Sequence, residues 1–258
     1  MRAFAGALTH TLPQVVLTCA RRSLLRSNMT TTTVAHARRP RRGRRLIKFS
    51  AALILLLAAW VAYDLYSSSR TSLRDFDADE VARLDTAMWR SYYSRQRAQL
   101  FTQLGELLRT QYRLPFWRSN AVAYRAAKAA FVFKDGHSRA DYERALPDLV
   151  SFYNSIRSVS DMDFDPERAA RLELEWWIVH RERKQHAAGD LERALADLEA
   201  ELYRVPAERL SEHARLRAEA MEIRDREAEQ GGVTEEDWRR IDELLHQSWR
   251  SLHAAVNP

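Results

Sequence analysis

The sequence has a single cysteine, Cys19, which excludes a disulfide within the chain. Any folded domain must therefore be stabilised by its own hydrophobic core, and 258 residues are enough to form one. Glycine and proline are also scarce, with seven of each, so few residues interrupt long helices. The sequence lacks G-x-S-x-G, a P-loop glycine run and HExxH. We therefore expect no cofactor and favour a protein that is not an enzyme.

Acidic residues are absent from the start of the chain, and the first of them is Asp64. Residues 1–48 contain ten arginines and Lys48, a charge of +11, whereas the whole chain carries +6, which leaves −5 for the remainder. The basic character belongs to the tail, so we expect no nucleic-acid binding. Residues 1–45 lack apolar periodicity, which predicts a disordered cytoplasmic tail, and Met29 offers an alternative start.

A long apolar segment follows six arginines at residues 38–45. Residues 46–66 are enough to cross a hydrocarbon core of about 30 Å, and we predict that they bind the lipid bilayer as a single transmembrane helix. Trp60, Tyr63 and Tyr66 lie near the far end, where interfacial aromatic residues are common. Because positive charge remains on the cytoplasmic side, the N-terminus is expected inside and the rest of the chain outside.

Cleavage after this segment would require small residues at positions −3 and −1 of the peptidase site. Ser67 with Ser69 approach this pattern, while bulky residues occupy most other registers. We therefore predict an uncleaved signal-anchor in the plasma (inner) membrane of a bacterial-type cell. The alternative is a soluble periplasmic protein that begins near Arg70.

The remainder of the chain has helical apolar spacing with no competing strand pattern. Residues 67–76 are expected to be a linker, and residues 77–256 an extracytoplasmic all-helical domain. The expected helices are 77–113, 116–134, 138–159 with a kink or break at Pro147, 165–189, 190–204, 206 to the Gly231-Gly232 break, and 234 onward. The sequence thus predicts an all-α bundle of six to seven helices; a tetratricopeptide-like array is the alternative.

One candidate ligand site lies in the stretch LELEWWIVHR, residues 172–181. At helical spacing, Leu172, Trp176 and Val179 form one stripe, which we interpret as core. The neighbouring stripe is Glu173, Trp177, His180 and Lys184, and Arg181 follows His180 in the sequence. An aromatic face with an acid, an imidazole and cations could form a ligand cleft. The alternative is that Trp177 packs at the rim of the core and His180 bonds to a neighbouring helix.

A second candidate site contains Trp117 and Arg118, which could hold an anionic ligand together with the loop that follows residue 133. The alternative is that these aromatic residues cover the core at helix ends. Metal binding is not expected, because Glu243-Leu244-Leu245-His246 is the single Glu-x-x-His and a di-iron bundle requires two.

The favoured function is a single-pass, membrane-anchored binding or scaffolding module of the cell envelope, with other membrane or envelope proteins as partners. The alternative is an extracytoplasmic small-ligand receptor or enzyme that uses the Trp/His/Arg cleft near residues 173–184.

Overall fold

The computed structural model describes residues 41–66 and 70–258, with side chains from residue 46 onward. The chain divides after Lys48 into two units, and the described part of the first is the start of helix α1 (Arg41–Tyr66). Residues 41–45 are therefore helical rather than disordered, because arginine is a good helix former and the apolar helix continues from it. The rest of the predicted disordered tail, residues 1–40, lies outside the described residues.

Helix α1 contains the segment Leu46–Tyr66, which has 21 residues and a mean hydropathy of 2.1. Among the described residues it is the one helix that is long and apolar enough to span a membrane. Its large apolar side chains are exposed; Leu55, for example, is 70% exposed. This predicted segment is therefore present as a helix whose apolar surface is not covered by the described residues.

The residues after α1 form an all-α domain, as predicted, and strands are absent from residues 41–66 and 70–258. Nine α-helices follow α1, so the predicted count of six to seven is wrong. They are α2 (Ala78–Tyr93), α3 (Arg97–Tyr112), α4 (Phe116–Asp135), α5 (Arg139–Glu143), α6 (Leu146–Arg157), α7 (Pro166–Arg181), α8 (Asp190–Tyr203), α9 (Ser211–Glu229) and α10 (Glu235–Val256). Two short 3₁₀ helices, η1 (Arg183–Gln185) and η2 (Ala207–Leu210), flank α8.

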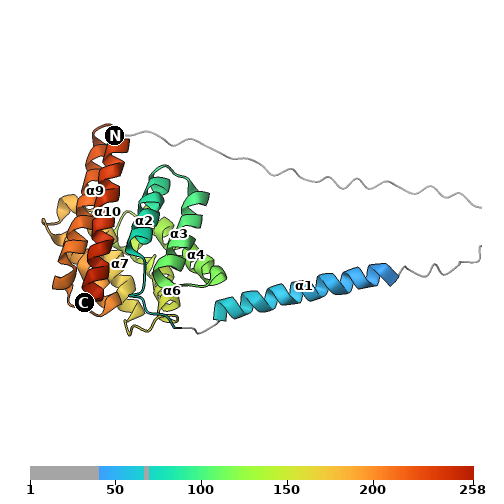
Figure 1. Ribbon diagram of the computed structural model, residues 1–258. Helices are drawn as coiled ribbons and strands as arrows, with labels where there is room; N and C mark the ends of the chain where they lie inside the picture. The colour runs from blue at the N-terminus through green and yellow to red at the C-terminus, as the bar shows by residue number, and fades with distance from the viewer. Residues whose placement is uncertain (1–40, 67–69) are drawn as a thin grey trace, which may run out of the picture. The chain divides into compact units, whose positions relative to one another are not determined.

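The long helices of this domain pack in chain order, and the last of them contacts the first. From α2 to α10, each long helix contacts the next along the chain, and α4 contacts α6 across the short α5. The last helix, α10, returns to pack against both α9 and α2 (Figure 1). An open array of helical repeats has no such closing contact between its first and last helices. The interior of the bundle is thereby enclosed by helices from both ends of the domain.

Of the two extra helices, one arises from a break at Arg95 and the other from the separation of α5 and α6. The predicted helix over residues 77–113 is interrupted between Tyr93 and Arg97, because Arg95 adopts a left-handed conformation with φ of 59°. Tertiary contacts hold the end of α2 in place: the guanidinium of Arg224 lies 3.1 Å from the ring centroid of Tyr93, and Trp238 packs against the same ring. The sequence has no glycine or proline here, so local signals could not reveal the break.

Other boundaries follow the predicted local signals. Asp165 caps α7 through the N–H groups of Glu167 and Arg168, and a capping box at Thr234 begins α10. The predicted break at Pro147 is confirmed, since α6 carries this proline in its first turn. Helix α7 ends at Arg181, well before the predicted end at residue 189, and η1 follows it.

Residues 70–76, predicted as part of a linker, pack into the domain. The side chains of Leu73 and Phe76 are buried, and Phe76 contacts the ring of Trp249. The N–H of Thr71 donates to the carbonyl of Val159 at 2.7 Å. This segment is therefore fixed to the loop that follows α6.

The left-handed conformation of Arg95 generates a prediction on stability. Arg95→Gly should raise the free energy of unfolding by about 1 kcal/mol, because glycine adopts this conformation without the clash of a Cβ atom. Chemical denaturation of the protein in detergent measures the change. Arg95→Ala, which keeps the Cβ atom, is the matched control and should give no gain; equal effects of both variants would contradict the strain at this residue.

Candidate functional site

A pair of opposite charges lies inside the bundle. Arg217 of α9 donates to Oδ2 of Asp85 on α2 at 2.5 Å, and Nε1 of Trp249 on α10 donates to the same oxygen at 3.0 Å. Asp85 is fully buried, and the guanidinium lies over the rings of Trp249 and Trp89. Both partners must be present, because an unpaired buried charge is strongly unfavourable.

The charge of Arg217 also acts on two further carboxylates, those of Glu199 and Glu173. Burial raises the pKa of Glu199 on α8 to about 7; the charge of Arg217 opposes the rise, and the charges of Glu173 and Asp85 add to it. Burial also raises the pKa of Glu173 on α7, although this carboxylate accepts hydrogen bonds from the Tyr153 hydroxyl at 2.7 Å and from Nε1 of Trp177 at 2.8 Å. Three carboxylates thus share one guanidinium, so Glu199 can hold a proton near neutral pH.

A buried imidazole completes the polar interior. His213 of α9 is fully buried, and its Nδ1 lies 3.0 Å from the carbonyl oxygen and 2.8 Å from the hydroxyl oxygen of Ser248. Burial, reinforced by the charge of Arg217, lowers its pKa to about 4. The ring is therefore neutral at neutral pH and links α9 to α10.

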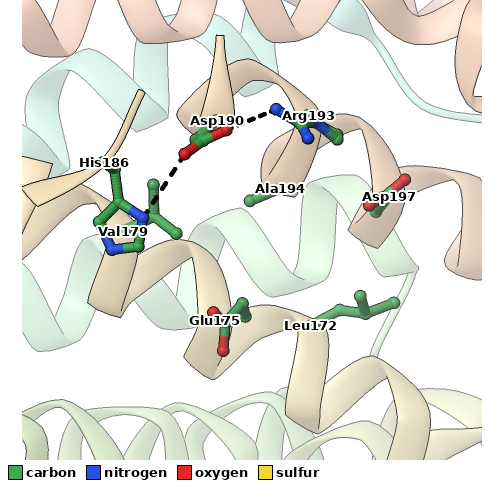
Figure 2. A pocket seen from close by; sticks show the side chains of 8 residues that line it. All are labelled: Leu172, Glu175, Val179, His186, Asp190, Arg193, Ala194 and Asp197. Atoms are coloured by element: carbon green, nitrogen blue, oxygen red, sulfur yellow. Dashed lines mark hydrogen bonds and ion pairs between the residues drawn. The ribbon is translucent and has the colours of Figure 1, made fainter. Parts of the chain in front are cut away.

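The surface between α7 and α8 is hollowed in two neighbouring places, and neither is lined by the interior polar residues described above, which are Asp85, Glu173, Glu199, His213 and Arg217. The first hollow has a volume of about 240 Å³. Figure 2 shows Asp190 between His186 and Arg193, opposite Leu172 and Glu175 of α7. Oδ2 of Asp190 lies 3.6 Å from Nδ1 of His186, and Arg193 donates to its Oδ1 at 2.5 Å. Asp190 thus pairs with His186 and Arg193 within this hollow, while Glu175 pairs with Arg139 outside it.

The second hollow has a volume of about 310 Å³ and is centred on Asp225 of α9. Nε2 of His180 and Nη1 of Arg183 each lie 3.1 Å from Oδ2 of Asp225, while Arg224 donates to its Oδ1 at 2.7 Å. Burial alone would raise the pKa of Asp225, but the hydrogen bonds from His180 and Arg224 and the nearby positive charges lower it to about 2. This hollow therefore carries the Asp225 carboxylate beside the His180 imidazole, in a volume at the lower limit for a small molecule.

The structure separates the residues of the first predicted site. Glu173 and Trp177 bond to each other and face the interior, where Trp177 packs against Phe133. Of the other three residues, which are His180, Arg181 and Lys184, only His180 lines one of the two hollows. Lys184 is exposed, with its Nζ 4.0 Å from Glu229.

Arg181 contacts the end of α4 and lines neither hollow. It donates to the carbonyl of Phe133 at 2.7 Å and to that of Gly136 at 3.2 Å, at the C-terminus of α4. Its guanidinium also lies 4.2 Å from the ring centroid of Phe133. Arg181 thus adds to the cap at the end of α4, where the Gly136 N–H also donates to the Phe133 carbonyl.

The second predicted site, Trp117 and Arg118, lies at the N-terminus of α4 and contacts the end of α1. Sequence reasoning missed Arg183, His186 and Asp225, although the first two follow the predicted stretch within six residues of His180. Asp225 could not be inferred because its proximity depends on how α9 packs against α7. Among the described residues, no group of three or more histidine, cysteine or acidic side chains could hold a metal ion.

Comparison of the chain with protein-family models, with curated proteins and with solved structures finds no match.

The raised pKa of Glu199 predicts a pH-dependent effect of Glu199→Gln. At pH 8 the native wild-type protein carries a buried charge that glutamine lacks, so the variant should be more stable by up to about 3 kcal/mol. As the pH falls from about 7 towards 4.5, the native state of the wild type takes up a proton at Glu199 and the difference should disappear. Urea unfolding at pH 8 and pH 5 measures both values.

Glu208→Gln is the matched control, because Glu208 is exposed beside the same helix. It should change stability little at either pH. If Glu199→Gln is more stable than the wild type by the same amount at pH 8 and at pH 5, the raised pKa of this residue is contradicted.

Proposed function

We propose that this chain is a single-pass membrane protein in which α1 spans the bilayer, the N-terminus is cytoplasmic and the helical domain is extracytoplasmic. In this proposal the domain is a binding or scaffolding module of a bacterial-type envelope complex, and its partners are other membrane or envelope proteins. It is anchored rather than cleaved. The observation that carries the proposal is the uncovered apolar surface of α1.

The length and exposure of α1 support membrane anchoring. A helix of 21 residues is about 32 Å long, which matches the hydrocarbon core of a bilayer. Soluble proteins rarely expose continuous apolar patches of more than a few hundred Å², and lipid would cover this one. The arginines at residues 38–45 lie on one side of the segment, which favours a cytoplasmic N-terminus.

The use of polar groups inside the domain supports a binding or scaffolding role. Glu173, Trp177 and Arg181 contact neighbouring helices, through Tyr153 of α6 for the first and Phe133 of α4 for the other two. In the two hollows, Asp190 and Asp225 pair with neighbouring histidine and arginine side chains. A surface with these properties is better suited to contact another protein than to enclose a substrate.

Reporter fusions test the topology. Alkaline phosphatase fused after Pro258 should be active, because it folds outside the cytoplasm, whereas green fluorescent protein at the same position should not fluoresce. Replacement of the six arginines at residues 38–45 by glutamine should weaken this orientation. A fluorescent fusion with inactive phosphatase would place the domain in the cytoplasm and contradict the proposal. Mass spectrometry of the membrane fraction checks retention of α1, since cleavage would give an N-terminus near Arg70.

One observation favours a second candidate function, a small-ligand receptor or enzyme. His180 and Arg183 meet Asp225 in a hollow of about 310 Å³, and a histidine beside a carboxylate can accept or donate a proton. In a strain that lacks this protein, the His180→Ala variant should then fail to restore the wild-type phenotype. His137→Ala, on an exposed histidine, is the matched control and should restore it. Full restoration by His180→Ala, with folding confirmed by circular dichroism, would remove this candidate.

A further inference from the structure

The first turn of α4 takes its cap from α1. Helix α4 begins after Pro115, which provides no side-chain cap, so its first N–H groups need other acceptors. Oδ2 of Asp64 accepts hydrogen bonds from the backbone N–H groups of Trp117 at 2.6 Å and of Arg118 at 3.1 Å. Asp64 is only 9% exposed, although it lies near the end of an otherwise exposed helix.

The contact is reciprocal. The guanidinium of Arg118 donates through Nε and Nη2 to the carbonyl oxygen of Leu65, at 3.0 and 2.5 Å. Arg118 is 7% exposed. Each helix terminus is thus capped by a charged side chain of the other helix, with the acid at a helix N-terminus and the cation at a helix C-terminus, as the helix dipoles favour.

The aromatic rings beside this contact indicate its depth along α1. The rings of Trp117 and Trp60 meet edge to face with centroids 5.7 Å apart, and Phe116 packs against Trp117. Trp60 precedes Tyr66 by six residues, which is about 9 Å along a helix. Trp117 therefore lies beside the apolar segment rather than beyond its end. Phe116 and Trp60 remain 48% and 51% exposed.

We propose that the first turn of α4, with Phe116 and Trp117, inserts into the interfacial layer of the bilayer on the side where α1 ends. The contact between Asp64 and Arg118 holds it there. The occupant of this aromatic surface is lipid, because the exposed Phe116, which packs on the half-buried Trp117, continues the row of exposed aromatic residues at the end of α1, where membrane interfaces favour such rings. The inference rests on the proposed function, in which α1 spans the membrane.

Fluorescence quenching in the full-length protein tests this placement. A polarity-sensitive thiol probe is attached to single cysteines in a Cys19→Ser background, and the protein is reconstituted in phosphatidylethanolamine/phosphatidylglycerol vesicles that contain spin-labelled lipid. With the spin label near the headgroup, the probe at Phe116→Cys should be quenched to the level found at Tyr63→Cys. The probe at Phe131→Cys, exposed near the other end of α4, is the matched control and should remain unquenched.

The probe at Leu53→Cys, with the spin label deep in the acyl chain, separates the possible failures. Quenching at residue 53 without quenching at residue 116 would overturn the insertion of α4 and leave the membrane anchor standing. Absence of quenching at residue 53 would overturn the anchor itself. Equal quenching at residues 116 and 131 would also overturn the inference, since the whole helix would then lie in lipid.

Asp64→Asn tests the contact that holds α4 in place. The variant keeps the shape of the side chain but loses the charge that caps α4, so quenching at residue 116 should fall towards the level at residue 131. Asp75→Asn, which removes an exposed carboxylate paired with Arg113, is the matched control and should leave quenching unchanged. Circular dichroism confirms folding of both variants. Unchanged quenching in Asp64→Asn would overturn the role of this contact.

Discussion

The interior of the helical domain depends on the pairing of Asp85 with Arg217. A charged side chain removed from water must find an opposite charge and hydrogen bonds, and this pair finds both between α2 and α9, with Trp249 of α10 as a further donor. Because α10 also returns to α2, the pair lies where the ends of the domain meet. It therefore joins α2, the first helix of the domain, to the last two helices, α9 and α10.

An aspartate and an arginine, Asp64 and Arg118, also form the contact between α1 and α4. The Asp64 carboxylate accepts from backbone N–H groups at the start of α4, and the Arg118 guanidinium donates to a backbone carbonyl at the end of α1. An aspartate at a helix start and an arginine at a helix end both follow the helix dipole, so two separate weak preferences add at one place. In the proposed membrane arrangement, this contact would transmit any tilt of α1 to α4.

The all-α class, the apolar segment and several boundaries could be predicted from the sequence, because they depend on local signals. The capping acid at Asp165 and the capping box at Thr234 act within one turn of helix. The break at Arg95 could not be predicted, since its cause lies in packing of Tyr93 against α9 and α10. The arrangement of the candidate site residues could not be predicted for a related reason. Helical spacing placed Glu173 and Trp177 on one stripe, as the structure has them, but spacing does not reveal that this stripe faces the interior.

Two buried groups give the domain opposite responses to acid. Glu199, with its pKa raised to about 7, stabilises the native state as the pH falls from about 7 towards 4.5, because the folded protein binds the proton first. His213, with its pKa lowered to about 4, has the reverse effect between about 6.5 and 4, because the unfolded chain binds the proton first. The two contributions therefore oppose each other as the pH falls, and the raised pKa of Glu173 acts in the same sense as that of Glu199.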